Sequence, residues 1–117
     1  MFDAVINNAD RKGSHLVLDQ FGSLWGFDHG LCAHAEPKLR TVLWGWVDKP
    51  IPDGEVTRLE ALAGSLGDPR SPVSQSIKGL LTPAEVDAVS QRIARLLSTG
   101  VFPGPNGRGP AVPWPPL

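Results

Sequence analysis

Two stretches of the chain place apolar residues at helical spacing and predict long helices. In the capping sequence "TPAE", Thr82 is the expected cap of a helix over residues 83–99, which carries an apolar face. We expect this helix to end at Gly100. Residues 53–66 carry a second apolar stripe, with Asp53 as the expected cap and Gly67 as the expected stop. Both stripes predict the core. Shorter helices are expected at 2–8 and 73–81.

Two short apolar runs, residues 15–19 and 23–27, predict the strands of a hairpin. Gly22 lies in the link between them and can take the positive φ that a tight turn requires. A polar turn, "DHG" at 28–30, follows the second run. The next apolar segment, 38–47, fits the helical period but is rich in tryptophan and β-branched residues, and we interpret it as a helix rather than a strand.

Proline and glycine are concentrated in residues 100–117, which excludes regular helix or sheet there. This tail is either an extended strap laid across the domain or a free polyproline segment. Trp114 favours the strap, because a tryptophan among prolines tends to dock on an apolar surface. The predicted fold class is α+β and mainly α. It has one β-hairpin and three to four helices in residues 1–99, followed by the extended Pro-rich tail.

Composition and charge exclude several classes of protein. The chain has 117 residues, enough for one small domain, and a net charge of −1, which argues against a nucleic-acid or anionic-membrane partner. No apolar run approaches the roughly 20 residues of a membrane span, and the first residues do not resemble a secretory signal. Cys32 is the only cysteine, so no internal disulfide forms. We expect a soluble, cytoplasmic domain.

Two aspartates in polar turns, Asp10 and Asp28, mark the two ends of the predicted hairpin. A phosphoryl-transfer site needs one carboxylate to orient or deprotonate the acceptor hydroxyl. It also needs a second carboxylate, with a neutral polar ligand, to hold Mg²⁺ on the nucleotide phosphates. A hairpin that returns the chain to its starting point would let both aspartates face the same phosphates.

The sequence "NNADRKGSH" followed by "GFDHGL" resembles the catalytic and metal-binding loops of the phosphatidylinositol 3-/4-kinase-related superfamily. It is similar to the type II phosphatidylinositol 4-kinases and to an uncharacterised actinobacterial branch, which "HAEPKLRTVLWGW" and the tail also resemble. The HipA-like toxin kinases are more distant relatives with similar loops. The specific motifs cover residues 1–47. The resemblance implies that residues 1–99 are a kinase-like C-terminal lobe, with the catalytic and metal loops at 7–30.

The resemblance also implies roles for individual residues. Asp10 falls on the catalytic aspartate, Arg11 would steady the loop or a phosphate, and Asp28 falls on the aspartate that binds magnesium. His15 replaces the asparagine ligand of the lipid kinases and is a poorer match for Mg²⁺. Asn8 lies close by and could serve instead, so His15 or Asn8 is the expected auxiliary ligand. The implied cofactors are Mg²⁺ and ATP.

Kinases of this kind also carry an N-terminal lobe with a phosphate-covering loop and a lysine that pairs with the phosphates. We recognise neither feature in this chain and expect a C-terminal piece of a larger fold, with weak or no kinase activity alone. The expected partners are a nucleotide and an unknown hydroxyl acceptor. The exposed face of the cleft would also take an N-lobe or a second copy of the chain.

Two other functions compete with the kinase. A metal-dependent hydrolase would gather a ligand set around zinc or manganese. A non-catalytic, pseudokinase-like interaction module would use the cleft face or the segment "VPWPPL". Lys38 and Arg40 either reach an anionic substrate or lie on a solvated helix face, and Cys32 is a weak candidate nucleophile. The hydrolase ligand set would be Asp10, His15, Asp28, His29 and His34.

Overall fold

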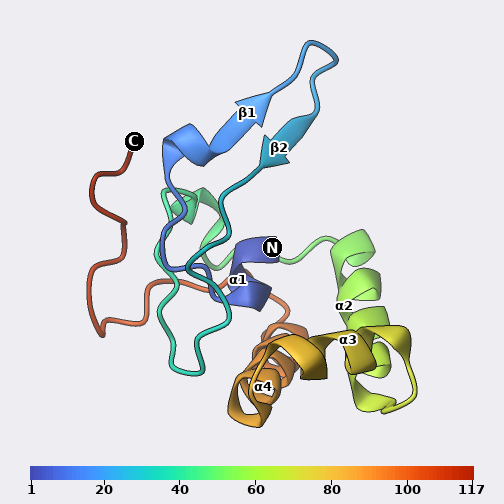
Figure 1. Ribbon diagram of the computed structural model, residues 1–117. Coiled ribbons are helices and arrows are strands. Elements are labelled where there is room, and N and C mark those ends of the chain that lie inside the picture. The colour runs from blue at the N-terminus through green and yellow to red at the C-terminus, as the bar shows by residue number, and fades with distance from the viewer.

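The computed structural model describes all 117 residues as four α-helices and one two-stranded antiparallel sheet, a mainly helical α+β fold. Figure 1 shows the helices gathered on one side, with the hairpin projecting from them and the tail running along the other side. Short 3₁₀ turns lie at Gly13–His15 and Trp44–Trp46. The elements are α1 (Phe2–Ile6), β1 (Leu16–Leu18), β2 (Leu24–Gly26), α2 (Asp53–Gly67), α3 (Pro72–Leu80) and α4 (Pro83–Thr99).

Local capping signals set the limits of α4, as the sequence predicts. The Thr82 hydroxyl accepts a hydrogen bond from the Glu85 backbone N–H at 3.3 Å, and the Glu85 carboxylate accepts one from the Thr82 N–H at 2.8 Å. Pro83 occupies the first helical position, and Gly100 ends the helix with a φ of 67°. The predicted span of 83–99 is confirmed.

The starts of α2 and α3 depend on proline and serine. Pro52 is the N-cap of α2, and Asp53 is the first helical residue, so the predicted Asp53 cap is wrong. Its carboxylate lies in the first turn, where it still interacts favourably with the helix dipole. In α3 the Ser71 hydroxyl accepts from the Ser74 N–H at 3.0 Å and caps the helix.

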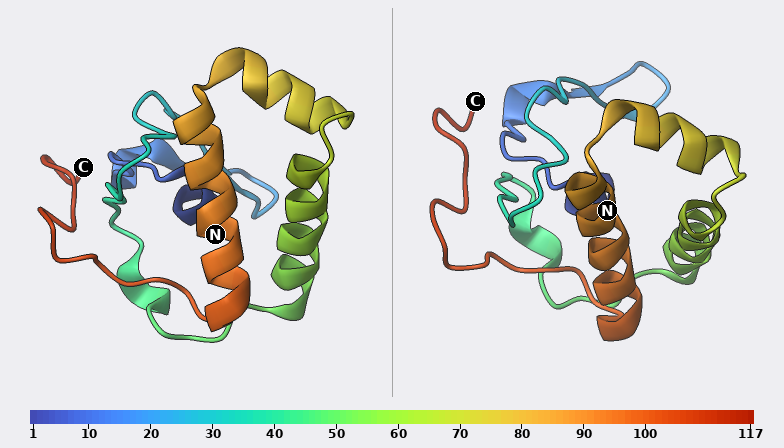
Figure 2. Two further views of the ribbon diagram at one scale, coloured as in Figure 1. Left: turned by 90° about the horizontal axis from the view of Figure 1, so that it is seen from below. Right: turned by 60° about the horizontal axis from the view of Figure 1, so that its bottom comes forward.

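The apolar core lies where α4 packs against α1 and α2. Figure 2 shows α4 between these two helices, with α3 crossing from α2 to the start of α4. The predicted stripes of α2 and α4 supply most of the core, and Ile51 joins them from the loop before α2. No helix is long and apolar enough to cross a bilayer. The buried apolar residues are Val5, Ile51, Leu59, Val89, Ile93 and Leu96.

The predicted hairpin forms, with Val17 paired to Trp25 and Leu18 paired to Leu24. Asp19 organises its turn by accepting hydrogen bonds from backbone N–H groups and, at 2.9 Å, from the Trp25 indole. Gly22 has the positive φ, 82°, that the turn requires. The two strands lie outside the core, and Val17, Leu18, Leu24 and Trp25 are 48–68% exposed.

The segment 38–47 is not a helix, and this prediction is wrong. Only Trp44–Trp46 forms a single 3₁₀ turn. The Arg40 N–H donates to the Asn8 carbonyl and its carbonyl accepts from the Arg11 N–H, at 3.0 and 3.1 Å. These bonds join the segment to a loop about thirty residues earlier. The backbone groups that form them are not available for helical hydrogen bonds, so the segment stays extended.

The tail lies extended along the loops of the first half of the chain. The Gly13 N–H donates to the Pro116 carbonyl at 2.8 Å, and the Trp44 indole donates to the Ala111 carbonyl at 3.0 Å. The expectation that Trp114 docks on an apolar surface is wrong, since this side chain is 89% exposed. Pro113 is the buried residue of the tail instead.

Candidate functional site

Buried polar side chains are concentrated in the loop between α1 and β1. Four of the six buried polar or charged residues, Asn7, Asn8, Arg11 and His15, lie within this short segment. Buried polar groups are stable only when hydrogen-bonded, so this loop forms a connected polar network. The network positions the two loops on which Asp10 and Asp28 lie.

Arg11 is the centre of this network and is only 2% exposed. Its Nε lies 2.9 Å from Asp3 Oδ2 and its Nη2 lies 2.9 Å from Asp3 Oδ1, while Nη1 donates to the Phe27 carbonyl at 2.6 Å. The hydrogen bond with Asp3 raises the pKa of Arg11. Its guanidinium therefore steadies the loop and leaves little surface for a phosphate.

Asp3 receives hydrogen bonds from both Arg11 and Asn8, although it lies on the first turn of α1. Burial acts to raise the pKa of the Asp3 carboxyl, but the hydrogen bonds and the positive charge of Arg11 outweigh it. The pKa therefore lies below its ordinary value. Asp3 is consequently an ionised anchor that ties α1 to the loop containing Asp10.

Asn8 uses both ends of its amide inside the protein. Its Nδ2 donates to Asp3 Oδ1 at 3.0 Å, its Oδ1 accepts from the Asp10 N–H at 2.9 Å, and the residue is 1% exposed. The geometry gives Asn8 the task of fixing the backbone at Asp10. The resemblance to lipid kinases implies that an auxiliary ligand presents an oxygen to the metal ion. The Asn8 amide oxygen points into the loop instead.

His15 and Asp28 are brought together at the base of the hairpin. His15 Nε2 lies 3.5 Å from Asp28 Oδ2, and the imidazole packs against the ring of Phe27. The Lys12 N–H points at His15 Nδ1 over 3.4 Å. Because Nδ1 accepts from this N–H, a neutral ring carries its hydrogen on Nε2, the atom that faces Asp28. A metal would need the Nε2 lone pair, so His15 is better placed as a donor than as a ligand.

Asp10 and Asp28 both keep carboxylate surface open to solvent. The Asp28 side chain is 57% exposed and its backbone has a φ of 58°, a left-handed conformation that turns the chain. The Asp10 side chain is 29% exposed and lies 3.7 Å from Lys12 Nζ. Two bonds fasten their loops together, from Arg11 Nη1 to the Phe27 carbonyl and from the Phe27 N–H to the His15 carbonyl.

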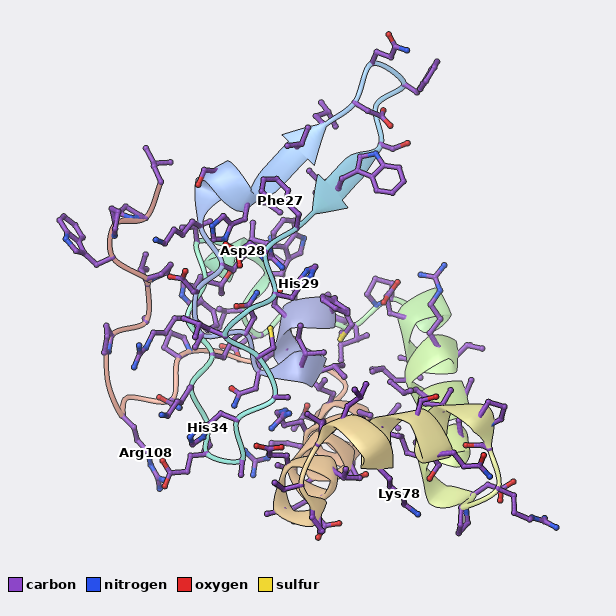
Figure 3. The ribbon with its side chains drawn as sticks, viewed as in Figure 1. Phe27, Asp28, His29, His34, Lys78 and Arg108 are labelled. Carbon is purple, nitrogen blue, oxygen red and sulfur yellow. The ribbon has the colours of Figure 1, made fainter.

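The five side chains named for a zinc or manganese hydrolase do not gather. No group of three or more His, Cys, Asp and Glu residues is arranged to hold a metal. His29 packs edge-on against Phe2, and His34 Nδ1 accepts from the Glu36 N–H at 3.0 Å. Figure 3 shows His34 well apart from Asp28 and His29. The geometry gives no support to the hydrolase.

Magnesium makes a smaller demand on the protein than zinc does. It keeps several waters and commonly takes one or two carboxylates together with substrate phosphates. Asp28 offers one exposed carboxylate and Asp10 a second, partly exposed one. Two carboxylates are too few for an all-protein cage, but they are the number that Mg²⁺ held on substrate phosphates commonly takes.

Cys32 is not arranged as a nucleophile. It is half-buried, and burial raises the pKa of its thiol, with a further contribution from the negative charge of Asp3. The thiolate is the reactive form, so a raised pKa makes this cysteine less reactive at neutral pH.

An open pocket of about 400 Å³ lies between α1 and the base of the hairpin. Its walls include Phe2, Leu16, Gly26 and His29, with Asp3 and Arg11 at its polar side. This pocket lies beside the fastened loops, and apolar side chains form part of its walls.

The sequence reasoning missed the roles of Asp3 and Asn7. Asn7 donates from Nδ2 to the His34 and Glu36 carbonyls at 2.8 and 2.7 Å, and its Oδ1 accepts from the Lys38 N–H at 2.9 Å. It therefore shapes the 34–38 loop as well as ending α1, where its φ is 55°. Asp3 is a charged residue in a short, otherwise apolar helix. This position is the one sequence signal that could have indicated its buried ion pair.

Comparison with known proteins finds similarity to Protein Rv2133c of Mycobacterium tuberculosis (strain ATCC 25618 / H37Rv). The two sequences are 48% identical over 115 residues, which cover 98% of this chain and 40% of the relative. The chain thus spans about 40% of the length of this curated relative. No protein-family model matches the chain, and no solved structure matches it.

Proposed function

We propose that this chain supplies the catalytic and metal-binding loops of a phosphotransferase similar to the phosphatidylinositol 3-/4-kinase-related superfamily. One observation carries the proposal: the hairpin returns the Asp28 loop to the Asp10 loop, and Arg11 bonds the two together through the Phe27 carbonyl. Two partly exposed carboxylates on loops fastened in this way are what phosphoryl transfer requires. The kinase-like C-terminal lobe is part of this proposal.

In this proposal Asp10 orients the acceptor hydroxyl and takes its proton. The acceptor oxygen forms a bond to the γ-phosphorus of ATP, and the bond from that phosphorus to the β–γ bridging oxygen breaks to release ADP. Mg²⁺, when bound, neutralises phosphate charge, and Asp28 is the side chain that would hold it. His15 holds Asp28 in position from its Nε2. The pocket lined by Phe2 and Leu16 would take the base of the nucleotide.

The acceptor is an unidentified hydroxyl compound. We propose this phosphotransferase activity for a longer protein that contains these loops. A phosphate-covering loop with its lysine is not found among the described elements. We therefore expect the 117-residue chain to bind Mg·ATP weakly and to transfer phosphate poorly by itself.

Alanine at Asp28 is expected to abolish binding of Mg·ATP to this chain, because it removes the exposed carboxylate at the hairpin base. The measurement is a calorimetric titration of the wild type and of Asp28→Ala with ATP, each with and without Mg²⁺. Asp87→Ala, an exposed substitution on α4, is the matched control and should bind as the wild type does. Equal affinity in Asp28→Ala and the wild type would reject the proposed metal site.

A second candidate, a non-catalytic interaction module, is favoured by the apolar surface of the hairpin. Isolated two-stranded ribbons are marginally stable in water, and natural proteins rarely leave such a large apolar surface uncovered. Both faces of this hairpin carry exposed apolar residues, and its turn adds Phe21. The exposed residues are Val17 (48%), Leu18 (68%), Phe21 (83%), Leu24 (65%), Trp25 (62%) and Phe27 (48%).

Self-association through the hairpin is the expected result in concentrated solution. The double variant Leu18→Ser/Leu24→Ser removes one apolar face and should shift sedimentation equilibrium toward the monomer. Leu80→Ser replaces an even more exposed leucine at the end of α3 and should leave the mass unchanged. If the double variant and the wild type have the same mass at every concentration, the hairpin is not the contact surface.

A further inference from the structure

A pocket of about 220 Å³ beside α4 is lined by polar groups that the proposed phosphotransferase site does not use. Gln91, Arg92 and Arg95 contribute from α4, Asn7 from the end of α1, and Asn106 from the tail. No aspartate or glutamate lines it. The walls thus combine two positive charges with the side-chain amides of Gln91 and Asn106, which can donate hydrogen bonds.

Arg92 is held in place without a negative partner. Its Nε donates to the Val5 carbonyl at 2.8 Å and its Nη1 to the His34 carbonyl at 3.3 Å. Its Nη2 is buried and has no hydrogen-bond partner, and no carboxylate lies within ion-pair distance. Burial lowers the pKa of this guanidinium below its ordinary value. A buried charge without a counter-charge is unfavourable, and an anion in the pocket that Arg92 lines would compensate it.

The surroundings of the pocket are also positively charged. An adjoining pocket of about 300 Å³ shares Pro37, Leu39 and Asn106 with the first. Together the two pockets are lined by five of the eleven Lys and Arg residues of the chain but by only one of its twelve Asp and Glu residues, Glu36. The chain as a whole carries a net charge of −1, so this concentration of cations is local. The five are Lys38, Arg40, Arg92, Arg95 and Arg108.

We infer that the pocket beside α4 binds a small organic anion, whose carboxylate or phosphate group is held by Arg92 and Arg95. Guanidinium groups suit both kinds of anion, because their planar N–H pairs match two oxygens at once. The alanine, proline and leucine side chains in the same walls would contact the apolar part of such a ligand. None of its lining residues belongs to the pocket at the hairpin base, so this is a second site, and Figure 3 shows Arg108 of the adjoining pocket well away from Asp28.

Titrations with inorganic phosphate and with succinate test the inference and separate the two ligand classes. Binding is followed in ¹H–¹⁵N spectra through the side-chain amide signals of Gln91 and Asn106. Saturable shifts of both signals are expected with at least one probe, and the probe that binds more tightly identifies the class. Addition of NaCl should weaken the binding, because part of it is Coulombic attraction.

Arg95 provides the decisive variant, since it is exposed on α4 and its replacement should not disturb folding. Arg95→Gln should weaken binding about tenfold, the effect of losing one charge-assisted contact. Arg70→Gln changes another exposed arginine, outside the pocket, and should leave the affinity unchanged. Asp28→Ala should also leave it unchanged, which separates this site from the nucleotide site. Absence of saturable binding by both probes, or equal affinity in Arg95→Gln and the wild type, overturns the inference.

Discussion

Asparagine at Asp3 is expected to destabilise the fold by about 2 to 3 kcal/mol, because it leaves the buried Arg11 guanidinium without a counter-charge. Arg11 is 2% exposed and forms its ion pair at 2.9 Å, whereas the Asp3 side chain is 15% exposed. Removing one partner of a fully buried pair costs about 3–5 kcal/mol, and the partial contact of Asp3 with water reduces that figure. Urea denaturation followed by tryptophan fluorescence measures the loss.

The same ion pair gives stability a defined dependence on pH. The pKa of Asp3 is lower in the folded chain than in the unfolded chain, so the carboxylate stabilises the fold fully above its ordinary pKa. This contribution is lost as the pH falls below about 4 and through the lowered pKa. Asp3→Asn should therefore lose less stability on acidification than the wild type. Asp87→Asn is the control and should lose as much stability on acidification as the wild type does. If Asp3→Asn also loses as much stability as the wild type, this role of Asp3 is contradicted.

Alanine at Ile93 is expected to cost about 3 to 4 kcal/mol, the usual effect of truncating a fully buried isoleucine. Ile93 is 0% exposed and belongs to the cluster in which α4 packs with α1 and α2. Because α1 also carries Asp3 and ends at the polar loop, loosening this cluster should weaken the Asp10 loop as well. Thermal and urea unfolding measure the stability, and the affinity for Mg·ATP measures the effect on the site.

The control for the core substitution is Leu80→Ala, at the exposed end of α3. Leu80 is 82% exposed, so its truncation should change stability by less than about 0.5 kcal/mol. Similar losses in Ile93→Ala and Leu80→Ala would mean that α4 does not form the centre of the core.

The elements that the sequence predicts well are those whose signals lie within a few residues. The capping box of Thr82 and Glu85 and the stop at Gly100 are local, and the structure confirms α4 from end to end. The hairpin likewise depends on Asp19 and Gly22 within its own turn. The 38–47 segment has a helical pattern of apolar residues, but its hydrogen bonds go to the loop at Asn8 and Arg11 and to the tail. Such distant partners override local periodicity and leave no signal within the segment.

The candidate site shows the same division. That Asp10 and Asp28 lie at the ends of a hairpin follows from the pattern of strands and turns, and the structure pairs the strands accordingly. The inward turn of the Asn8 amide was not predictable, because it depends on Asp3, which a helix brings back to the loop. His15 is a candidate ligand only because the resemblance places it where the lipid kinases have an asparagine ligand. Its role as a donor emerges only from the Lys12 N–H that faces Nδ1.

The most direct test of the phosphotransferase proposal is a paramagnetic titration of the ¹⁵N-labelled chain with Mn·ATP, in which Mn²⁺ replaces Mg²⁺. The account predicts that Asp28, His29 and Gly30 lose intensity first and that Asp10 follows, while α2 and α3 stay unaffected. Mn²⁺ without ATP should broaden these signals much less, because the protein offers too few ligands of its own. Broadening that is uniform over the chain, or centred away from the hairpin base, would contradict the proposed site.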